Sequence, residues 1–347
     1  MALLVLSSAD KLEKTQELLR NLIRREKVIV IAYSGGKDST VVLDLTIKTI
    51  LDNNFKNKIV ILHGDTLVEN PIIHDHASNV INKVHSFLLT KGIEVEVKIC
   101  KPEKDRTFWV NLIGKGYPLP NHRFRWCQKH LKIKPAEKAI SEFQEGIMLL
   151  GMRLDESIDR KRSMLKRIDG FKMGYRGNLP VYAPLAYWTE EEVWEYLLRE
   201  SSPWGEDYLE VVRIYKEARG ECPLIPSNNK SLSACGSRFG CWVCTLVKED
   251  KSLKNQIKNN QTLAPLYEFR NWLINFCSKP ENRTGYNRKG IYLGYGRGTL
   301  TIKARKKILE KLEKLQEDTK MGLISREEKD IILHIIEQEE LRTERNL

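Results

Sequence analysis

The chain has 347 residues, of which 41% are hydrophobic, so it can fill a globular core. We therefore expect a folded protein and not an intrinsically disordered one. A formal net charge of +12 suits a polyanionic partner such as a nucleic acid, and a basic protein without such a partner is the alternative that net charge alone does not separate. No apolar run approaches the roughly 20 residues of a membrane helix. The N-terminal sequence lacks a basic flank and a cleavage site, so we expect a cytoplasmic protein without a membrane partner.

Apolar runs recur along the first 200 or so residues in a pattern typical of alternating strands and helices. Leu and Ile at helical spacing predict an amphipathic helix from Lys11 to about Lys27. The β-branched run that follows predicts a strand buried on both faces. The predicted strands are 28–33, 58–62, 93–99, 147–150 and 181–183. This order predicts an α/β fold with a doubly wound, mainly parallel sheet.

Thr189 and Glu192 have the spacing of a capping box and predict a helix start.

The C-terminal part differs in composition. After Trp204 the chain becomes rich in cysteine, glycine and basic residues, and further helices are predicted at 303–316 and 326–341. The predicted domains are a nucleotide-binding domain (1–204), a cysteine-rich iron–sulfur region (205–280) and a basic helical segment (281–347).

A glycine-rich loop joins the first predicted strand to a helix. Its residues are Ser34, Gly35, Gly36, Lys37, Asp38 and Ser39. Strand, glycine turn and helix start direct backbone N–H groups and the helix dipole at an anion. The spacing is not that of a Walker A loop or of G-x-G-x-x-G, so hydrolysis between the β- and γ-phosphates is not expected. A plain strand-to-helix turn is the alternative.

This SGGKDS loop resembles the pyrophosphate loop of the superfamily of N-type ATP pyrophosphatases and phosphoadenosine phosphosulfate reductases, whose fold is adenine nucleotide alpha hydrolase-like. The resemblance implies that ATP with Mg²⁺ binds the loop and Asp65, and that Lys37, Asp38, Arg153 and Arg160 are catalytic. The segments around Asp65, Gly151 and Pro184 follow predicted strands, so they should line the carboxyl ends of one sheet.

Three longer segments, 108–127, 202–222 and 235–253, resemble the sulfurtransferase of bacterial DNA phosphorothioation systems, the DndC type. That resemblance implies a [4Fe–4S] cluster. It also implies cleavage of ATP to AMP and pyrophosphate, which activates a DNA phosphate for replacement of a non-bridging oxygen by sulfur. The implied partners are DNA, a cysteine desulfurase as sulfur donor and other phosphorothioation subunits.

The cysteines predict a metal site. Cys235, Cys241 and Cys244 form C-x5-C-x2-C, and Cys127 is expected to supply a fourth thiolate, with Trp242 and Phe239 shielding the site. Zinc is the rival metal, although structural zinc sites usually bring two close cysteine pairs. Cys222 competes with Cys127 for the fourth position. Cys100 and Cys277 lie in apolar surroundings and are expected to be buried structural thiols.

A basic stretch from Arg283 to Lys307 contains eight Lys or Arg residues, three tyrosines and no Asp or Glu. Phosphate contacts and aromatic stacking there would suit DNA or RNA, and a solvated basic loop is the alternative.

Three other functions remain open at this stage. Thiolation of tRNA shares the loop, the cluster and a basic surface. Reduction of phosphoadenosine phosphosulfate is disfavoured, because a cysteine near the chain end is expected there and the last cysteine here is Cys277. A DNA-binding subunit with a relic nucleotide site is disfavoured by the intact loop.

Overall fold

The computed structural model of the chain describes residues 6–219 and 239–345. The chain divides into two compact units that interleave along the sequence. The first unit consists of Met1–Gly64, Pro71–Cys100 and Ala136–Phe239, and the second of Asp65–Asn70, Lys101–Pro135 and Gly240–Leu347. This division follows compactness alone, so the domain boundaries expected at residues 204 and 280 stay a prediction.

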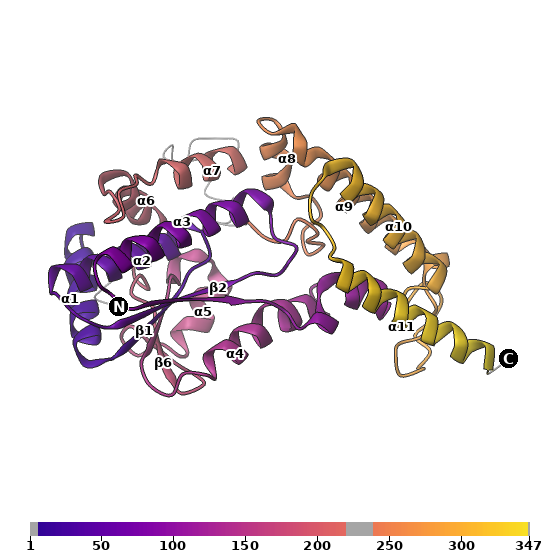
Figure 1. Ribbon diagram of the computed structural model, residues 1–347, viewed down its shortest axis with the longest axis horizontal. Coiled ribbons are helices and arrows are strands. Elements are labelled where there is room, and N and C mark those ends of the chain that lie inside the picture. Colours follow the sequence, from indigo (N-terminus) through magenta and orange to yellow (C-terminus); the bar gives the residue numbers. More distant parts are fainter. Residues whose placement is uncertain (1–5, 220–238, 346–347) are drawn as a thin grey trace. The chain divides into compact units, whose positions relative to one another are not determined.

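The first unit is built on a six-stranded sheet (Figure 1). Its strands are β1 (Val28–Ala32), β2 (Lys58–Gly64), β3 (Val95–Cys100), β4 (Ile147–Leu150), β5 (Lys172–Arg176) and β6 (Leu179–Tyr182). In space their order is β3-β2-β1-β4-β6-β5, and every neighbouring pair is parallel except β5 with β6. The predicted α/β class with a mainly parallel sheet is therefore confirmed.

Strand β5 was not predicted from the sequence. It is short, it carries Lys172, Gly174 and Arg176, and it forms the antiparallel edge of the sheet beside β6. An edge strand with one solvated face needs no continuous apolar run, so it lacks the signal that marks the buried strands.

Helices cover both faces of this sheet (Figure 1). They are α1 (Ser8–Arg25), α2 (Lys37–Asp52), α3 (Pro71–Thr90), α4 (Lys134–Ile140), α5 (Ile158–Leu165), α6 (Glu190–Arg199) and α7 (Leu209–Arg219), with a 3₁₀ turn η5 (Leu154–Glu156). Ile29 and Ile31 of β1 pack in one core with α1, α2, α3, α6 and α7. Val30, between them, packs in the other with α4 and α5. Successive side chains of β1 point to opposite faces of the sheet, and Ile29, Val30 and Ile31 are all buried, so a hydrophobic layer covers each face.

The helix start predicted at Thr189 is confirmed. The Thr189 hydroxyl accepts from the Glu192 N–H at 3.2 Å, and the Glu192 carboxylate accepts from the Thr189 N–H at 2.7 Å. The same carboxylate binds Lys11 Nζ at 2.7 Å, which ties the start of α6 to α1. A local sequence signal and a long-range ion pair therefore fix the same helix end.

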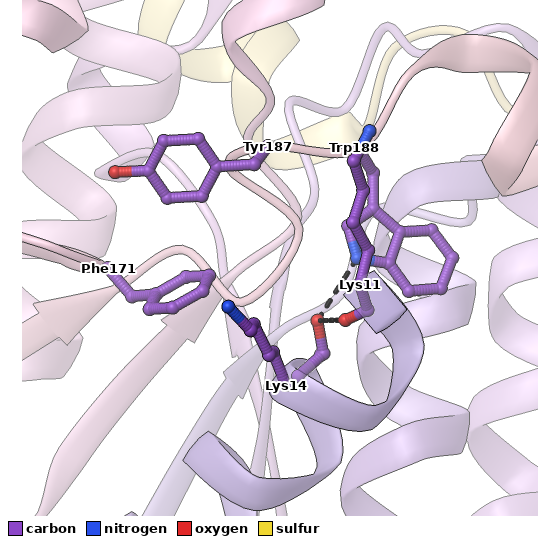
Figure 2. A pocket seen from close by; sticks show the side chains of 6 residues that line it. Lys11, Lys14, Phe171, Tyr187 and Trp188 are labelled. Carbon is purple, nitrogen blue, oxygen red and sulfur yellow. Dashed lines mark hydrogen bonds between the residues drawn. The ribbon is translucent and has the colours of Figure 1, made fainter. Parts of the chain in front are cut away.

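Helix α1 also packs on the segment that precedes α6 (Figure 2). The Trp188 indole N–H donates to the Thr15 hydroxyl at 3.0 Å, and that hydroxyl donates to the Lys11 carbonyl at 2.8 Å. Lys14, Phe171 and Tyr187 complete the walls of a cavity of about 10 Å³. Such a volume admits at most one water, so this surface is a packing contact and not a ligand site.

The second unit is irregular and helical. Its elements are η2 (Lys104–Arg106), the π-helices η3 (Val110–Gly114) and η4 (Gln128–Ile133), α8 (Lys251–Ile257), η6 (Gln261–Leu263), α9 (Ala264–Ser278), η7 (Pro280–Asn282), α10 (Ile302–Thr319) and α11 (Arg326–Arg345). The helices predicted at 303–316 and 326–341 are confirmed. Across the described residues no helix is both long and apolar enough to cross a membrane.

Candidate active site

The glycine-rich loop lies between β1 and the first turn of α2. The Ser39 hydroxyl accepts from the Ser34 N–H at 3.2 Å, lies 3.1 Å from the Ser34 hydroxyl and donates to the Gly36 carbonyl at 2.9 Å. Gly36 is the N-cap of α2 and offers no side-chain cap, so first-turn N–H groups other than that of Lys37, which meets the Tyr215 hydroxyl, can face an anion. The loop is thus folded on itself around the helix N-terminus.

Lys37 is held over two aromatic rings. Its Nζ lies 5.1 Å from the Tyr215 ring centroid and 5.9 Å from that of Trp194. It also lies 3.7 Å from Glu190 Oε1 and 3.3 Å from Asp38 Oδ2. Burial lowers the pKa of the ammonium, but Tyr215, Asp38 and Glu190 outweigh it and the net shift of the pKa is upward. Lys37 therefore presents a fixed positive charge at the helix start.

Asp38 is bound by a buried arginine. Arg153 Nε donates to Asp38 Oδ1, and Arg153 Nη1 lies 3.5 Å from the Trp188 carbonyl oxygen. Only 2% of Arg153 is exposed. Two of the predicted catalytic residues, Asp38 and Arg153, are thus brought together, and their ion pair ties the loop to the chain that follows β4.

Two glycines allow the loop its position. Gly35 has a φ of +75°, and a Cβ there would lie 2.9 Å from the Cβ of Ala77. Gly151 follows β4, and a Cβ there would lie 2.7 Å from the Ser39 nitrogen and 2.8 Å from the Asp38 carbonyl carbon. Real Cβ atoms do not approach so closely, so the backbone after β4 supports the loop only because residue 151 has no side chain.

The other predicted residues of this site have different surroundings. Arg160 is exposed on α5 and pairs with Glu156, whose other carboxylate oxygen accepts from the Arg153 N–H at 3.0 Å. Asp65 belongs to the second unit, where its carboxylate accepts from the Leu67 N–H at 2.8 Å. The roles of Arg160 and Asp65 stay predictions.

Sequence reasoning missed three groups that surround Lys37. Glu190 and Trp194 follow the predicted helix start at Thr189 and Tyr215 lies in the segment 202–222, but none of the three was predicted to contact the loop. The Tyr215 hydroxyl also accepts from the Lys37 N–H at 3.4 Å. All three lie more than 150 residues from the loop in the sequence, so no local pattern predicts that they contact Lys37. Only the folded structure shows these contacts.

The cysteines converge within the second unit. Burial, together with the neighbouring thiols of Cys241 and Cys244, raises the pKa of Cys127 to about 11. The Cys244 N–H donates to the Cys241 carbonyl at 2.9 Å, and the Thr66 hydroxyl lies 3.4 Å from Cys241 Sγ. Three of the four predicted ligands, Cys127, Cys241 and Cys244, therefore lie near one another although they belong to two segments that are distant in the sequence. Cys235 and its rival Cys222 lie outside the described residues.

Buried tryptophans flank two of these cysteines in the sequence. Trp126 and Trp242, next in sequence to Cys127 and Cys241, are 4% and 2% exposed. The Trp242 ring packs on Phe269 at 5.9 Å between centroids. Phe239, expected at the same place, instead contacts the Tyr215 ring at 4.8 Å in the first unit. As predicted, Cys100 and Cys277 are buried.

A buried arginine holds the cysteine loop. Arg270 of α9 is 0% exposed, and it donates to the carbonyls of Cys244 at 2.9 Å and Val247 at 2.6 Å. Among the described residues no group of three or more His, Cys, Asp or Glu side chains could hold a metal ion. The three described thiols, Cys127, Cys241 and Cys244, have the donor chemistry of an iron–sulfur cluster, and the predicted fourth donor, Cys235, lies outside the described residues, so the cluster stays a prediction.

Comparison with known proteins identifies the family. The model of the phosphoadenosine phosphosulfate reductase domain matches residues 28–247, which is more than half of the chain. The chain belongs to this family. The match begins at β1, contains the glycine-rich loop and Arg153, and extends past Cys244. The family and the sheet order together agree with the adenine nucleotide alpha hydrolase-like fold expected from the loop.

Curated relatives are distant. The chain is 26% identical to an uncharacterized protein of Methanocaldococcus jannaschii over 77% of this chain and 46% of that protein. It is 26% identical to the adenosine 5′-phosphosulfate reductase of Oceanobacillus iheyensis over 64% of this chain and 80% of that enzyme. The aligned part thus spans less than half the length of the first relative.

Solved structures are similar at a low level. The U34-tRNA thiolase of Methanococcus maripaludis, solved with its [4Fe–4S] cluster, is 15% identical, with a TM-score of 0.37 over 77% of this chain and 80% of that one. A likeness of this size carries no argument about the reaction of the present chain.

Proposed function

We propose that this chain is an ATP-dependent sulfurtransferase that cleaves ATP to AMP and pyrophosphate and thereby activates a DNA backbone phosphate for sulfur insertion. The observation that carries the proposal is the loop at the start of α2, where a helix N-terminus without a side-chain cap and the Lys37 ammonium lie at the carboxyl end of a parallel strand. The choice of DNA rests on the resemblance of the three longer segments to the DndC type.

The chemistry requires an activated phosphate, because oxide is too poor a leaving group for direct replacement. A non-bridging oxygen of the DNA phosphate attacks the α-phosphorus of ATP, and the bond to the β-phosphate breaks with pyrophosphate leaving. A thiol reductant releases sulfide from the persulfide of the donor and is itself oxidised to a disulfide. The sulfide then attacks the DNA phosphorus, the bond to the bridging oxygen breaks, and AMP departs with that oxygen. The loop N–H groups and Lys37 would hold the pyrophosphate as its charge grows.

Asp38 and Arg153 act as a support for the loop in this proposal. Their ion pair holds the first turn of α2 against the chain after β4. Mg²⁺ would supply positive charge to the phosphates of ATP, and Asp38, the carboxylate of the loop, would orient either this ion or the loop itself. Arg160, with 41% of its side chain exposed, could contact substrate.

The cysteines would hold a [4Fe–4S] cluster in this account, through Cys127, Cys235, Cys241 and Cys244. Such a cluster supplies iron that can bind sulfide or transfer electrons. A cysteine desulfurase would deliver the sulfur, and other phosphorothioation subunits would select the DNA.

ATP cleavage is expected to give AMP and pyrophosphate, because the loop lacks the spacing of a Walker A motif. Chromatography of the products of the purified protein, incubated with DNA and a sulfur donor, measures this directly. ADP and phosphate as the products would contradict the proposal.

Replacing Arg270 by Leu is expected to make the protein lose iron, because the change leaves the Cys244 and Val247 carbonyls without donors at about 1–3 kcal/mol each. Iron per chain and the rate of bleaching by a chelator are the readouts, both measured on anaerobically purified protein.

Arg305→Leu is the matched control. Arg305 is 1% exposed in the same unit, but it donates to the carbonyls of Ile113 and Gly114. It should lower the thermal midpoint while iron is retained below that midpoint. Equal iron loss in both variants would mean that Arg270 acts only through the stability of the unit.

A further inference from the structure

A loop of the second unit, residues 284–299, presents three tyrosines to solvent. We name it the tyrosine loop. Tyr286, Tyr292 and Tyr295 are 48%, 62% and 78% exposed. The rings of Tyr286 and Tyr292 lie 5.1 Å apart, whereas the Tyr295 side chain has no ring or hydrogen-bond partner among the described residues. Aromatic faces gathered on a surface in this way mark an interaction site.

The tyrosine loop is ordered by its own backbone. The Thr284 N–H donates to the Thr299 carbonyl at 2.9 Å, and the Thr299 N–H donates to the Tyr286 carbonyl at 2.8 Å. Gly298 permits this crossing, because a Cβ there would lie 2.2 Å from the Tyr286 carbonyl oxygen. The exposed rings therefore stand on a preformed support, and a ligand would not bear the cost of ordering the loop.

The charge of the tyrosine loop is positive throughout. It contains no Asp or Glu, and its three basic residues, Arg288, Lys289 and Arg297, are exposed and form no ion pair within the described part of the chain. The Arg288 guanidinium lies 5.4 Å from the Tyr117 ring centroid, so it is also held in place. The patch thus combines aromatic faces with free cations.

Helix α10 carries four further basic residues of the predicted stretch, of which Lys303 is exposed and the other three are less accessible to a polyanion. Arg305 is buried against backbone carbonyls, Lys306 pairs with Glu340 at 2.6 Å and Lys307 with Glu310 at 2.9 Å. A polyanion would therefore meet the tyrosine loop in preference to these helix residues.

We propose that the tyrosine loop binds unpaired bases of DNA, with Tyr295 stacking on a base and Arg297 and Lys289 contacting phosphates. Bases in a duplex are already stacked on each other, so only an unpaired stretch offers free faces to the tyrosines. Phosphates alone would need no exposed rings. The choice of DNA over RNA rests on the proposed function, whereas the preference for single strands rests on the loop itself.

Fluorescence anisotropy of a labelled oligothymidylate and of a duplex of equal length tests this with the full chain. Tyr295→Ala should weaken binding of the single strand by about fivefold to a hundredfold, without changing the salt dependence. Tyr295→Phe, which keeps the ring, should bind within about twofold of the parent protein. Tyr175→Ala removes a tyrosine that is 63% exposed in the first unit and should change nothing.

Arg297→Gln should reduce the slope of log affinity against log salt by about 0.7, the value for one phosphate contact on a single strand. The proposal is overturned if Tyr295→Ala has no effect, if it weakens duplex binding equally, or if an oligouridylate of equal length binds more tightly than the DNA. It is also overturned if light scattering shows that Tyr295→Ala dissociates an oligomer, because the loop would then be a self-association surface.

The two proposals fail separately. If the protein makes no phosphorothioate but Tyr295→Ala still weakens single-strand binding, the tyrosine loop is supported and the proposed reaction is wrong. If phosphorothioate forms at the same rate in Tyr295→Ala and binding is unchanged, the reaction stands and the inference about the loop is wrong.

Discussion

Gly151→Ala is expected to lower ATP cleavage by about a hundredfold or more, because a displacement near 1 Å of a positioned group has that effect on rate. The added methyl would lie 2.7 Å from the Ser39 nitrogen, so the first turn of α2 must move. The same overpacking should destabilise the fold by about 1–3 kcal/mol. Turnover and thermal unfolding of the purified variant measure the two effects.

Gly64→Ala is the matched control for this experiment. Gly64 ends β2 at the same edge of the sheet, and a Cβ there would meet no atom within 4 Å. Its turnover should stay close to that of the parent protein. Equal activity of both alanine variants would show that the loop does not hold the reacting phosphates.

Cys127→Ser is expected to abolish the iron–sulfur cluster, because a cubane needs four thiolates and Cys127 is the ligand expected from outside the short cysteine loop. Anaerobically purified parent protein should be brown, with roughly four irons per chain and little zinc. The variant should be colourless. Metal analysis and visible absorption give the result.

Cys100→Ser and Cys277→Ser serve as controls, since both thiols are buried, neither belongs to the predicted ligand set, and both changes should leave the iron in place. Cys235→Ser should lose the iron as Cys127→Ser does. If Cys127→Ser retains its iron and Cys222→Ser loses it, the fourth ligand is Cys222 and not Cys127. One zinc and no iron in the parent protein would contradict the cluster altogether.

Local signals made much of the fold predictable. Strand β1, the glycine-rich loop and the start of α2 are consecutive, so one apolar run followed by SGGKDS identifies all three. The capping box at Thr189 is local in the same way. The edge strand β5 was not predicted, because its exposed face carries no apolar pattern.

The surroundings of the site were not predictable, because they depend on contacts between distant segments. Tyr215 and Glu190 face Lys37 only after the sheet has formed. The basic stretch shows the same limit. The sequence does not distinguish exposed basic residues from buried ones, yet Arg305 is buried and Arg297 is exposed. Long basic side chains bury or extend according to tertiary packing.

The nucleic acid that receives sulfur decides between the proposed reaction and tRNA thiolation. Both use the loop, the cysteines and a positive surface, and net charge cannot separate them. The tyrosine loop would serve either substrate through its stacking faces. Only analysis of the product distinguishes them.

Mass spectrometry of nucleosides and dinucleotides tests the central claim most directly, on DNA and RNA from cells with and without the gene. The account predicts dinucleotides from DNA in which sulfur replaces one phosphate oxygen, present with the gene and absent both without it and in cells that carry Gly151→Ala. Sulfur that depends on the gene in tRNA nucleosides alone, with DNA unchanged, would contradict the account.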